Sequence, residues 1–186
     1  MVSCLATFQR MNIGVFCSAN NRIDAAYFRA AEELGRWMAE NGHTLVYGGC
    51  NLGLMEAVGR AAHDHGGTTV GVVPRIVEKA GRVSDAVSVD IACEDLTDRK
   101  QIIMERSDVF VALPGGIGTL DEIFTVAASR SIGYHRKKLY LLNIGGFYDA
   151  LTAALDDLAR RGMTRGDWRD CIEPVSTLSE LQEKLA

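Results

Sequence analysis

Short apolar runs alternate along this chain with longer segments in which apolar residues recur every three or four positions. The short runs have the length of strands, and the longer segments show the spacing of amphipathic helices. Residues 75–85 follow neither pattern. The strands predicted in this way cover residues 12–17, 44–47, 69–73, 87–91, 109–113 and 139–142. The predicted helices cover residues 24–41, 52–65, 96–106, 119–132, 148–160 and 177–185.

The predicted strands are apolar almost throughout, which is typical of parallel strands buried on both faces. Strands and helices alternate along the chain, as in repeated βαβ units. We therefore expect an α/β fold with a single Rossmann-like, doubly wound parallel sheet and helices on both faces. We expect one domain over residues 11–186, and sheets of this kind bind ligands at the carboxyl ends of their strands.

Residues 1–10 show little periodicity, whereas a strand pattern begins directly after them. We expect these residues to be a loose leader, with Met11 as the functional start. N-terminal sequencing of the native protein tests this hypothesis.

Composition narrows the possible partners. The chain has 186 residues, of which 47% are hydrophobic, enough for the core of one domain. Its net charge is −4 and its charges are mixed, so we expect no nucleic acid partner. The apolar runs are too short to span a bilayer, so we expect no membrane partner. The five cysteines show no metal-ligand spacing, so we expect no metal site and a cytoplasmic location.

Two glycine-rich turns follow predicted strands and lead into predicted helices, at residues 46–55 and 111–122. A helix start carries unpaired N–H groups and a partial positive charge, and glycine lets a phosphate approach them closely. Neither turn has the Gly-Lys-Ser/Thr ending of a Walker A loop or a clean GxGxxG pattern. Taken alone, each turn fits tight packing between strand and helix as well as it fits a phosphate site.

The second turn has a further structural interpretation. Thr119 and Glu122 have the spacing of a capping box, so they could simply begin a helix at Thr119. Asp121 and Glu122 would also suit a first helical turn, where negative charge is favoured.

The wider motif favours a functional role for the second turn over a purely structural one. The stretch from Pro114 to Glu122 resembles the PGGxGTxxE signature of the Lonely guy family, the cytokinin riboside 5′-monophosphate phosphoribohydrolases often labelled lysine decarboxylases. The resemblance runs from about residue 12 to residue 163. It includes Val-Phe-Cys at 15–17, Tyr-Gly-Gly at 47–49, Gly-Leu-Met at 53–55, Arg-Lys at 99–100, Leu-Asn at 142–143 and Gly-Phe-Tyr at 146–148.

This resemblance implies an enzyme that hydrolyses the N-glycosidic bond of a nucleoside 5′-monophosphate to free base and ribose 5-phosphate. It implies no metal and no organic cofactor, and a homodimer with the pocket near the subunit interface. The implied catalytic residues are Arg99 and Glu122. The substrate-binding candidates are Ser18, Gly48, Gly49, Lys100, Gly115, Gly116, Ile117, Gly118, Thr119, Leu120 and Asp121.

The residue types agree with this chemistry. Cleavage builds positive charge on the ribose ring, and a carboxylate beneath the ring can stabilise that charge and orient a water. We expect a helix start to keep Glu122 ionised, which makes it a poor acid for the leaving base. Arg99 supplies a planar fork of donors for phosphate or for the glutamate. For the dimer interface we expect the helices at 96–106 and 119–132, with Ile102, Ile103, Ile123 and Phe124.

Several departures from the family pattern leave the identity of the substrate's base undetermined. The positions that differ are Cys50, the turn Ser18-Ala19-Asn20, Leu96, Ile117, Ala128 and Ser129. Cytokinin nucleotides, adenosine monophosphate and other purine monophosphates all remain candidate substrates.

Two other functions remain open. A non-catalytic protein that binds a nucleotide or the molybdenum cofactor would share the glycine signature, but it would not need both Arg99 and Glu122. A pyridoxal phosphate decarboxylase would need a Schiff-base lysine, and Lys100 is the only lysine in a suitable place.

Overall fold

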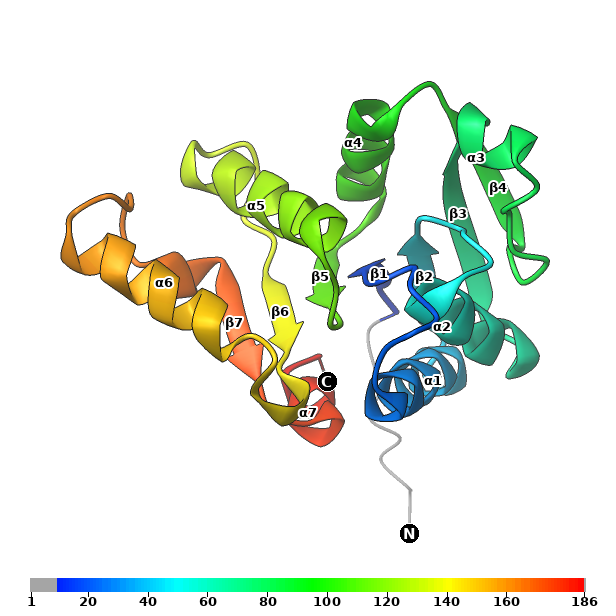
Figure 1. Ribbon diagram of the computed structural model, residues 1–186, viewed down its shortest axis with the longest axis horizontal. Helices are drawn as coiled ribbons and strands as arrows, with labels where there is room; N and C mark the ends of the chain where they lie inside the picture. Colours follow the sequence, from blue (N-terminus) through cyan, green and yellow to red (C-terminus); the bar gives the residue numbers. More distant parts are fainter. Residues whose placement is uncertain (1–9, 186) are drawn as a thin grey trace, which may run out of the picture.

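One parallel sheet runs through the computed structural model, which describes residues 10–185 (Figure 1). Its strand order is β4-β3-β2-β1-β5-β6-β7, so the chain builds outward from β1 and then returns to its other side. This arrangement confirms the predicted doubly wound α/β fold. The strands are β1 (Asn12–Phe16), β2 (Thr44–Tyr47), β3 (Thr68–Pro74), β4 (Val89–Cys93), β5 (Val109–Ala112), β6 (Leu139–Leu142) and β7 (Ile172–Val175).

Helices cover both faces of the sheet (Figure 1). One hydrophobic cluster joins the sheet to α1, α2 and α7, and a second joins it to α4, α5 and α6. A short helix, α3, lies between β3 and β4. The helices are α1 (Ala25–Glu40), α2 (Gly53–Asp64), α3 (Arg75–Lys79), α4 (Leu96–Arg106), α5 (Ile117–Ser131), α6 (Asp149–Arg160) and α7 (Leu178–Leu185), with 3₁₀ turns η1 (Ile144–Gly146) and η2 (Trp168–Asp170).

Local side-chain caps explain why several helices begin where the sequence predicts. The Asp24 carboxylate accepts a hydrogen bond from the backbone N–H of Ala26, and Asp95 caps the start of α4 in the same way. At α7, the Thr177 hydroxyl accepts from the N–H of Glu180, at 3.1 Å. The Glu180 carboxylate reaches back to the N–H of Ser176 instead of that of Thr177, at 2.8 Å.

Two strands differ from the prediction by more than one residue at an end. The strand expected at 87–91 is β4 at Val89–Cys93, because residues 84–87 form a turn and the Val87 side chain fills the space over Gly71. The edge strand β7 was not predicted at all. It contains Pro174, which lacks an N–H group and is tolerated in a strand only where a partner is missing on one side.

The apolar residues expected at a dimer interface fall into two groups. Ile103 and Ile123 are fully buried in the protein's own core, so their assignment to an interface is wrong. Both lie on the sides of α4 and α5 that face the sheet. Ile102 is partly buried against the same core cluster, whereas Phe124, the residue after Ile123 on α5, is 43% exposed.

The expected leader lies mainly outside the described residues, which begin at Arg10. Among residues 10–185, every helix is too short or too polar to cross a membrane.

A buried histidine makes stability depend on pH. His43 packs on Trp37 with ring centroids 4.9 Å apart, and its Nδ1 accepts a hydrogen bond from the Met11 N–H at 3.2 Å. Burial lowers the pKa of His43 from its ordinary value of 6.5, so the unfolded chain takes up the proton first. We expect the contribution of His43 to stability to fall as pH drops below 6.5, by up to about 1.4 kcal/mol per pH unit.

The variant His43→Asn tests this expectation in urea unfolding between pH 5 and 8, because Asn offers an acceptor to Met11 but does not titrate. It should lose this part of the pH dependence, whereas His63→Asn on the exposed side of α2 should keep it. The same pH dependence in the wild type and in His43→Asn would contradict the assignment.

Candidate active site

The carboxyl ends of β1 and β5 mark the point where the strand order reverses. These two strands are neighbours in register, with Phe16 opposite Ala112. The chain leaves them at Cys17 and Leu113, and Figure 1 shows α5 starting directly after β5. This is the place where doubly wound sheets bind their ligands, as the sequence predicts.

A buried ion pair lies beside this point. Arg99 of α4 donates from Nη2 to Oε1 of Glu122 on α5, at 2.7 Å. The side chains are only 14% and 4% exposed, respectively. Burial raises the pKa of Glu122 to about 7, against the lowering effect of the Arg99 guanidinium. The site therefore holds a carboxyl group that changes its charge close to neutral pH.

The capping box that Thr119 and Glu122 could have formed at the start of α5 is absent. The helix begins at Ile117, two positions before Thr119, so Glu122 lies in its second turn and faces Arg99. The expectation that a helix start keeps Glu122 ionised fails for the same reason. Burial controls the Glu122 pKa, and Thr119 is a buried residue within the first turn.

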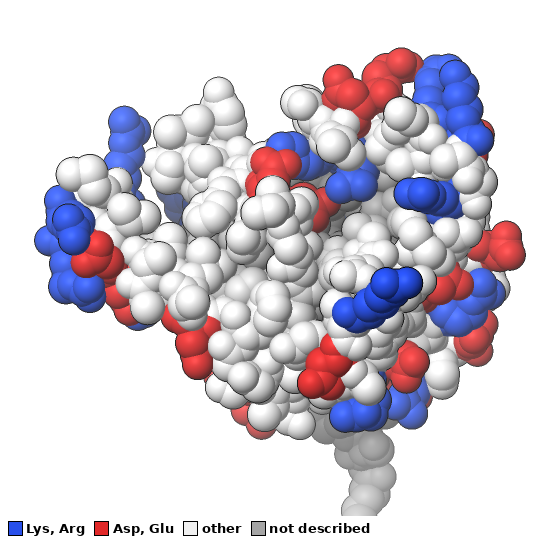
Figure 2. All heavy atoms as spheres, in the orientation of Figure 1, with Lys and Arg blue, Asp and Glu red and all other residues white. Residues whose placement is uncertain are grey.

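A second pair crosses between the same two helices. Lys100 Nζ donates to both carboxylate oxygens of Asp121, at 2.9 and 2.8 Å. Asp121 is half-exposed, so this pair lies on the outer side of the buried one. Figure 2 shows basic and acidic side chains scattered over this face without a large area of one charge. The two pairs connect α4 and α5 beside the site.

A cavity of about 530 Å³ opens over the buried pair. Six of the predicted residues line it: Ser18, Arg99, Gly116, Gly118, Thr119 and Glu122. The remaining candidates lie around the cavity without lining it: Gly48, Gly49, Lys100, Gly115, Ile117, Leu120 and Asp121. The prediction missed four lining residues: Cys17, Ala19, Asn20 and Met55. Their place directly after β1 or within the Gly-Leu-Met motif was the available signal.

The two glycine turns differ in whether the backbone N–H groups at their helix starts are free to bind a ligand. At α2, the Gly53 N–H donates to the Asn21 side chain at 2.7 Å, and the Leu54 N–H donates to the Ser18 carbonyl at 2.8 Å. The start of α2 is therefore occupied by the protein itself. At α5 no side chain caps the first turn, and Gly116 and Gly118 face the cavity. The start of α5 is the one that remains open to an anion.

The glycines of the first turn serve packing in this structure. A Cβ on Gly48 would lie 3.3 Å from Nη1 of Arg99 and 3.2 Å from the sulfur of Met55. Gly49 has a φ of +63°, and a Cβ there would lie 2.8 Å from Val73. Gly48 thus leaves room for the Arg99 guanidinium, and Gly49 lets the turn pack against β3.

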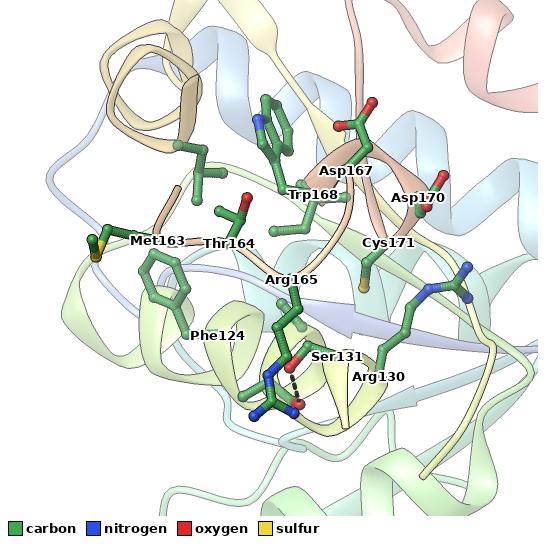
Figure 3. A pocket seen from close by; sticks show the side chains of 14 residues that line it. Phe124, Arg130, Ser131, Met163, Thr164, Arg165, Asp167, Trp168, Asp170 and Cys171 are labelled. Atoms are coloured by element: carbon green, nitrogen blue, oxygen red, sulfur yellow. Dashed lines mark hydrogen bonds between the residues drawn. The ribbon is translucent and has the colours of Figure 1, made fainter. Parts of the chain in front are cut away.

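A second cavity, of about 570 Å³, lies between α5, α6 and residues 163–172. Figure 3 shows Phe124 and Met163 toward one end of it and Arg130 toward the other. It contains none of the predicted catalytic or substrate-binding residues, but Ala128, one of the departures from the family pattern, lines it. Among residues 10–185, no group of three His, Cys, Asp or Glu side chains is placed to hold a metal ion.

The fold and the site define a Rossmann-like α/β protein with a buried carboxylate–guanidinium pair beside an open helix start. A family model described as "Possible lysine decarboxylase" matches residues 55–185. The probable cytokinin riboside 5′-monophosphate phosphoribohydrolase LOGL5 of Oryza sativa subsp. japonica is 39% identical over 92% of this chain and 70% of its own. LOG3 of Arabidopsis thaliana, a cytokinin riboside 5′-monophosphate phosphoribohydrolase, is 35% identical over 93% of this chain and 80% of its own. The chain belongs to this family, the Lonely guy (LOG) family.

Solved structures share the fold. The molybdenum cofactor binding protein of Rippkaea orientalis superposes with a TM-score of 0.73 at 24% identity, over 95% of this chain and 96% of that one. The Moco carrier protein of Chlamydomonas reinhardtii gives a TM-score of 0.72 at 25% identity over the same shares. The fold is therefore common to proteins named as enzymes and proteins named as carriers.

Proposed function

We propose that this protein hydrolyses the N-glycosidic bond of nucleoside 5′-monophosphates and releases the free base and ribose 5-phosphate. The observation that carries the proposal is the buried Arg99–Glu122 pair at a cavity that also contains the open start of α5. The names of the relatives at 35–39% identity point to the same reaction.

Each part of the site has a role in this reaction. The 5′-phosphate binds at the start of α5, where the backbone near Gly116 and Gly118 is uncapped. The ribose then lies over the Glu122 carboxylate, which stabilises the positive charge that develops as the bond between C1′ and the base breaks. Water adds its hydroxyl group to C1′, and its remaining proton is transferred to the departing base. Arg99 holds the carboxylate in place.

The direct test is a panel of nucleoside monophosphates, including adenosine monophosphate and an N6-prenylated analogue, assayed with a chelator present. Chromatography should show free base and an equal amount of ribose 5-phosphate from at least one of them. The proposal needs neither a metal nor an organic cofactor, so the chelator should have no effect. Release of no base from any member of the panel would overturn the proposal.

A second candidate function is the carriage of a nucleotide-like cofactor without turnover. The solved structures named as molybdenum cofactor carriers favour it, since they share the fold over 95% of this chain. Tight binding of a nucleotide with no base released on prolonged incubation would support the carrier and exclude the hydrolase.

We also propose that the protein works as a homodimer in the cytoplasm. Two apolar residues with exposed side chains, Phe124 of α5 and Met163, line the second cavity, and Ile132 and Tyr134 are exposed just past the end of α5. Ala128, which stands at a family substrate position, lines that cavity and not the cavity over Glu122. A second copy seated on this face would cover the apolar residues and bring its own α5 near the site. The free thiols of Cys17, Cys50, Cys93 and Cys171 suit a reducing compartment.

The dimer is tested by placing a charge on this face. Phe124→Glu should convert the dimer into a monomer in light scattering across a concentration series, because an unpaired carboxylate is costly in a buried interface. Ile76→Glu makes the same change on α3, at a residue that is 76% exposed, and should leave the dimer intact. A wild-type protein that is monomeric at every concentration would refute the dimer.

A further inference from the structure

The carbonyl of Leu113 lies just past the end of β5, immediately before the signature turn. The Leu113 N–H donates to the Phe16 carbonyl of β1 at 2.9 Å, so Leu113 faces β1, but the Ser18 N–H beyond Phe16 donates to the Pro114 carbonyl. Among residues 10–185, the Leu113 carbonyl accepts no hydrogen bond from a backbone N–H. It accepts instead from the phenol hydroxyl of Tyr148, at 2.7 Å in the protein interior.

We infer that Tyr148 is a positioning residue for the phosphate seat of the proposed hydrolase, the uncapped backbone near Gly116 and Gly118. It acts by holding the Leu113 carbonyl, and through it the turn that leads into α5. Tyr148 is 1% exposed and does not line the cavity over Glu122. It cannot touch a bound nucleotide directly. Its effect on the site passes through the backbone from Leu113 to Gly116.

The phenol is itself held firmly. The Tyr148 N–H donates to Oδ1 of Asn143 at 2.6 Å, and Nδ2 of Asn143 donates to Asp149 at 2.8 Å. The Phe147 ring packs edge-on against the Tyr148 ring, with centroids 4.9 Å apart. The start of α6 therefore forms a rigid support for a single hydroxyl group aimed at the end of β5.

The turn is held at the next residue as well. The Pro114 carbonyl accepts from the Ser18 N–H at 3.2 Å, which ties the turn to the loop after β1. Two consecutive carbonyls are thus fixed before the chain reaches Gly116, the residue that precedes α5. Glu122 is anchored separately by Arg99. Loss of the phenol bond should therefore disturb the phosphate seat more than the carboxylate.

The experiment compares Tyr148→Phe with Tyr140→Phe. Tyr140 is also largely buried, but its hydroxyl makes no hydrogen bond within residues 10–185. Tyr148→Phe should raise KM for the nucleoside monophosphate and Kd for ribose 5-phosphate about tenfold, with kcat changed by less than about threefold. Its kcat/KM for the matching nucleoside, which has no phosphate, should be unchanged. Tyr140→Phe should match the wild type in all four constants.

A purely structural role for Tyr148 would lower the melting temperature and leave these constants unchanged in the folded protein. Asn143→Ala is the second variant, because it keeps the phenol but removes both side-chain bonds that support it. A wild-type Kd for ribose 5-phosphate in whichever of the two variants is folded would overturn the inference.

The inference rests on the proposed function, and the Kd measurement separates the two. A wild type that binds ribose 5-phosphate but releases no base would sink the hydrolase, and the Kd values of the variants would still decide the role of Tyr148. A wild type that releases base but binds no ribose 5-phosphate would overturn the role of Tyr148 and leave the hydrolase standing.

Discussion

Replacing Glu122 by glutamine should lower kcat by at least about 10²-fold, equivalent to about 2.7 kcal/mol of barrier. The glutamine oxygen can still accept the hydrogen bond from Arg99, so the fold and nucleotide affinity should persist. What is lost is the negative charge that faces the ribose when positive charge develops on it. Because Glu122 lies in the second turn of α5, loss of a helix cap cannot account for such an effect.

The pH profile provides a second signature of the same residue. Burial raises the pKa of Glu122 to about 7, so the charged fraction of this carboxyl grows as pH rises through neutrality. The kcat/KM of the wild type should rise with pH and level off above this value. Glu122→Gln should lack this rise because its amide does not titrate.

The control is Glu105→Gln, the same change at an exposed residue of α4. It should keep wild-type turnover. Measuring kcat, nucleotide Kd and melting temperature on one preparation separates lost catalysis from lost folding. Wild-type turnover in a folded Glu122→Gln would end the catalytic assignment.

Nucleoside monophosphates should be cleaved with a kcat/KM at least about 10³-fold above that of the matching nucleosides, equivalent to about 4 kcal/mol. The start of α5 offers uncapped backbone N–H groups and the positive end of a helix dipole, and both need an anion to act on. Hydrogen bonds to a charged phosphate contribute roughly 1.5–3 kcal/mol each, so a few such bonds can supply this difference.

Gly118→Ala isolates this effect. A Cβ at Gly118 meets no protein atom within 4 Å, and the residue lies inside α5 on the wall of the cavity. The melting temperature should stay level or rise, because alanine favours a helix over glycine by about 1 kcal/mol. The nucleotide KM should rise, since the added methyl group takes space at the phosphate seat. Equal kcat/KM for a nucleotide and its nucleoside in the wild type would refute the phosphate requirement.

Much of the fold follows from local sequence. The span of α4 at 96–106 and that of β2 at 44–47 were predicted to the residue, because apolar spacing and caps such as Asp95 are local signals. The doubly wound class followed from apolar strands alternating with helices. The location of the site followed from the same argument, since parallel strands place their carboxyl ends at one edge of the sheet.

Only the tertiary structure decided which helix start is open to an anion and at what pH the Glu122 carboxyl group becomes charged. Both glycine turns look alike in sequence, but Asn21, which lies 32 residues before Gly53, closes the start of α2 and leaves α5 free. The Glu122 pKa depends on burial and on Arg99, 23 residues away. Local patterns describe how each segment folds, whereas burial, long-range hydrogen bonds and ion pairs exist only after distant segments pack together.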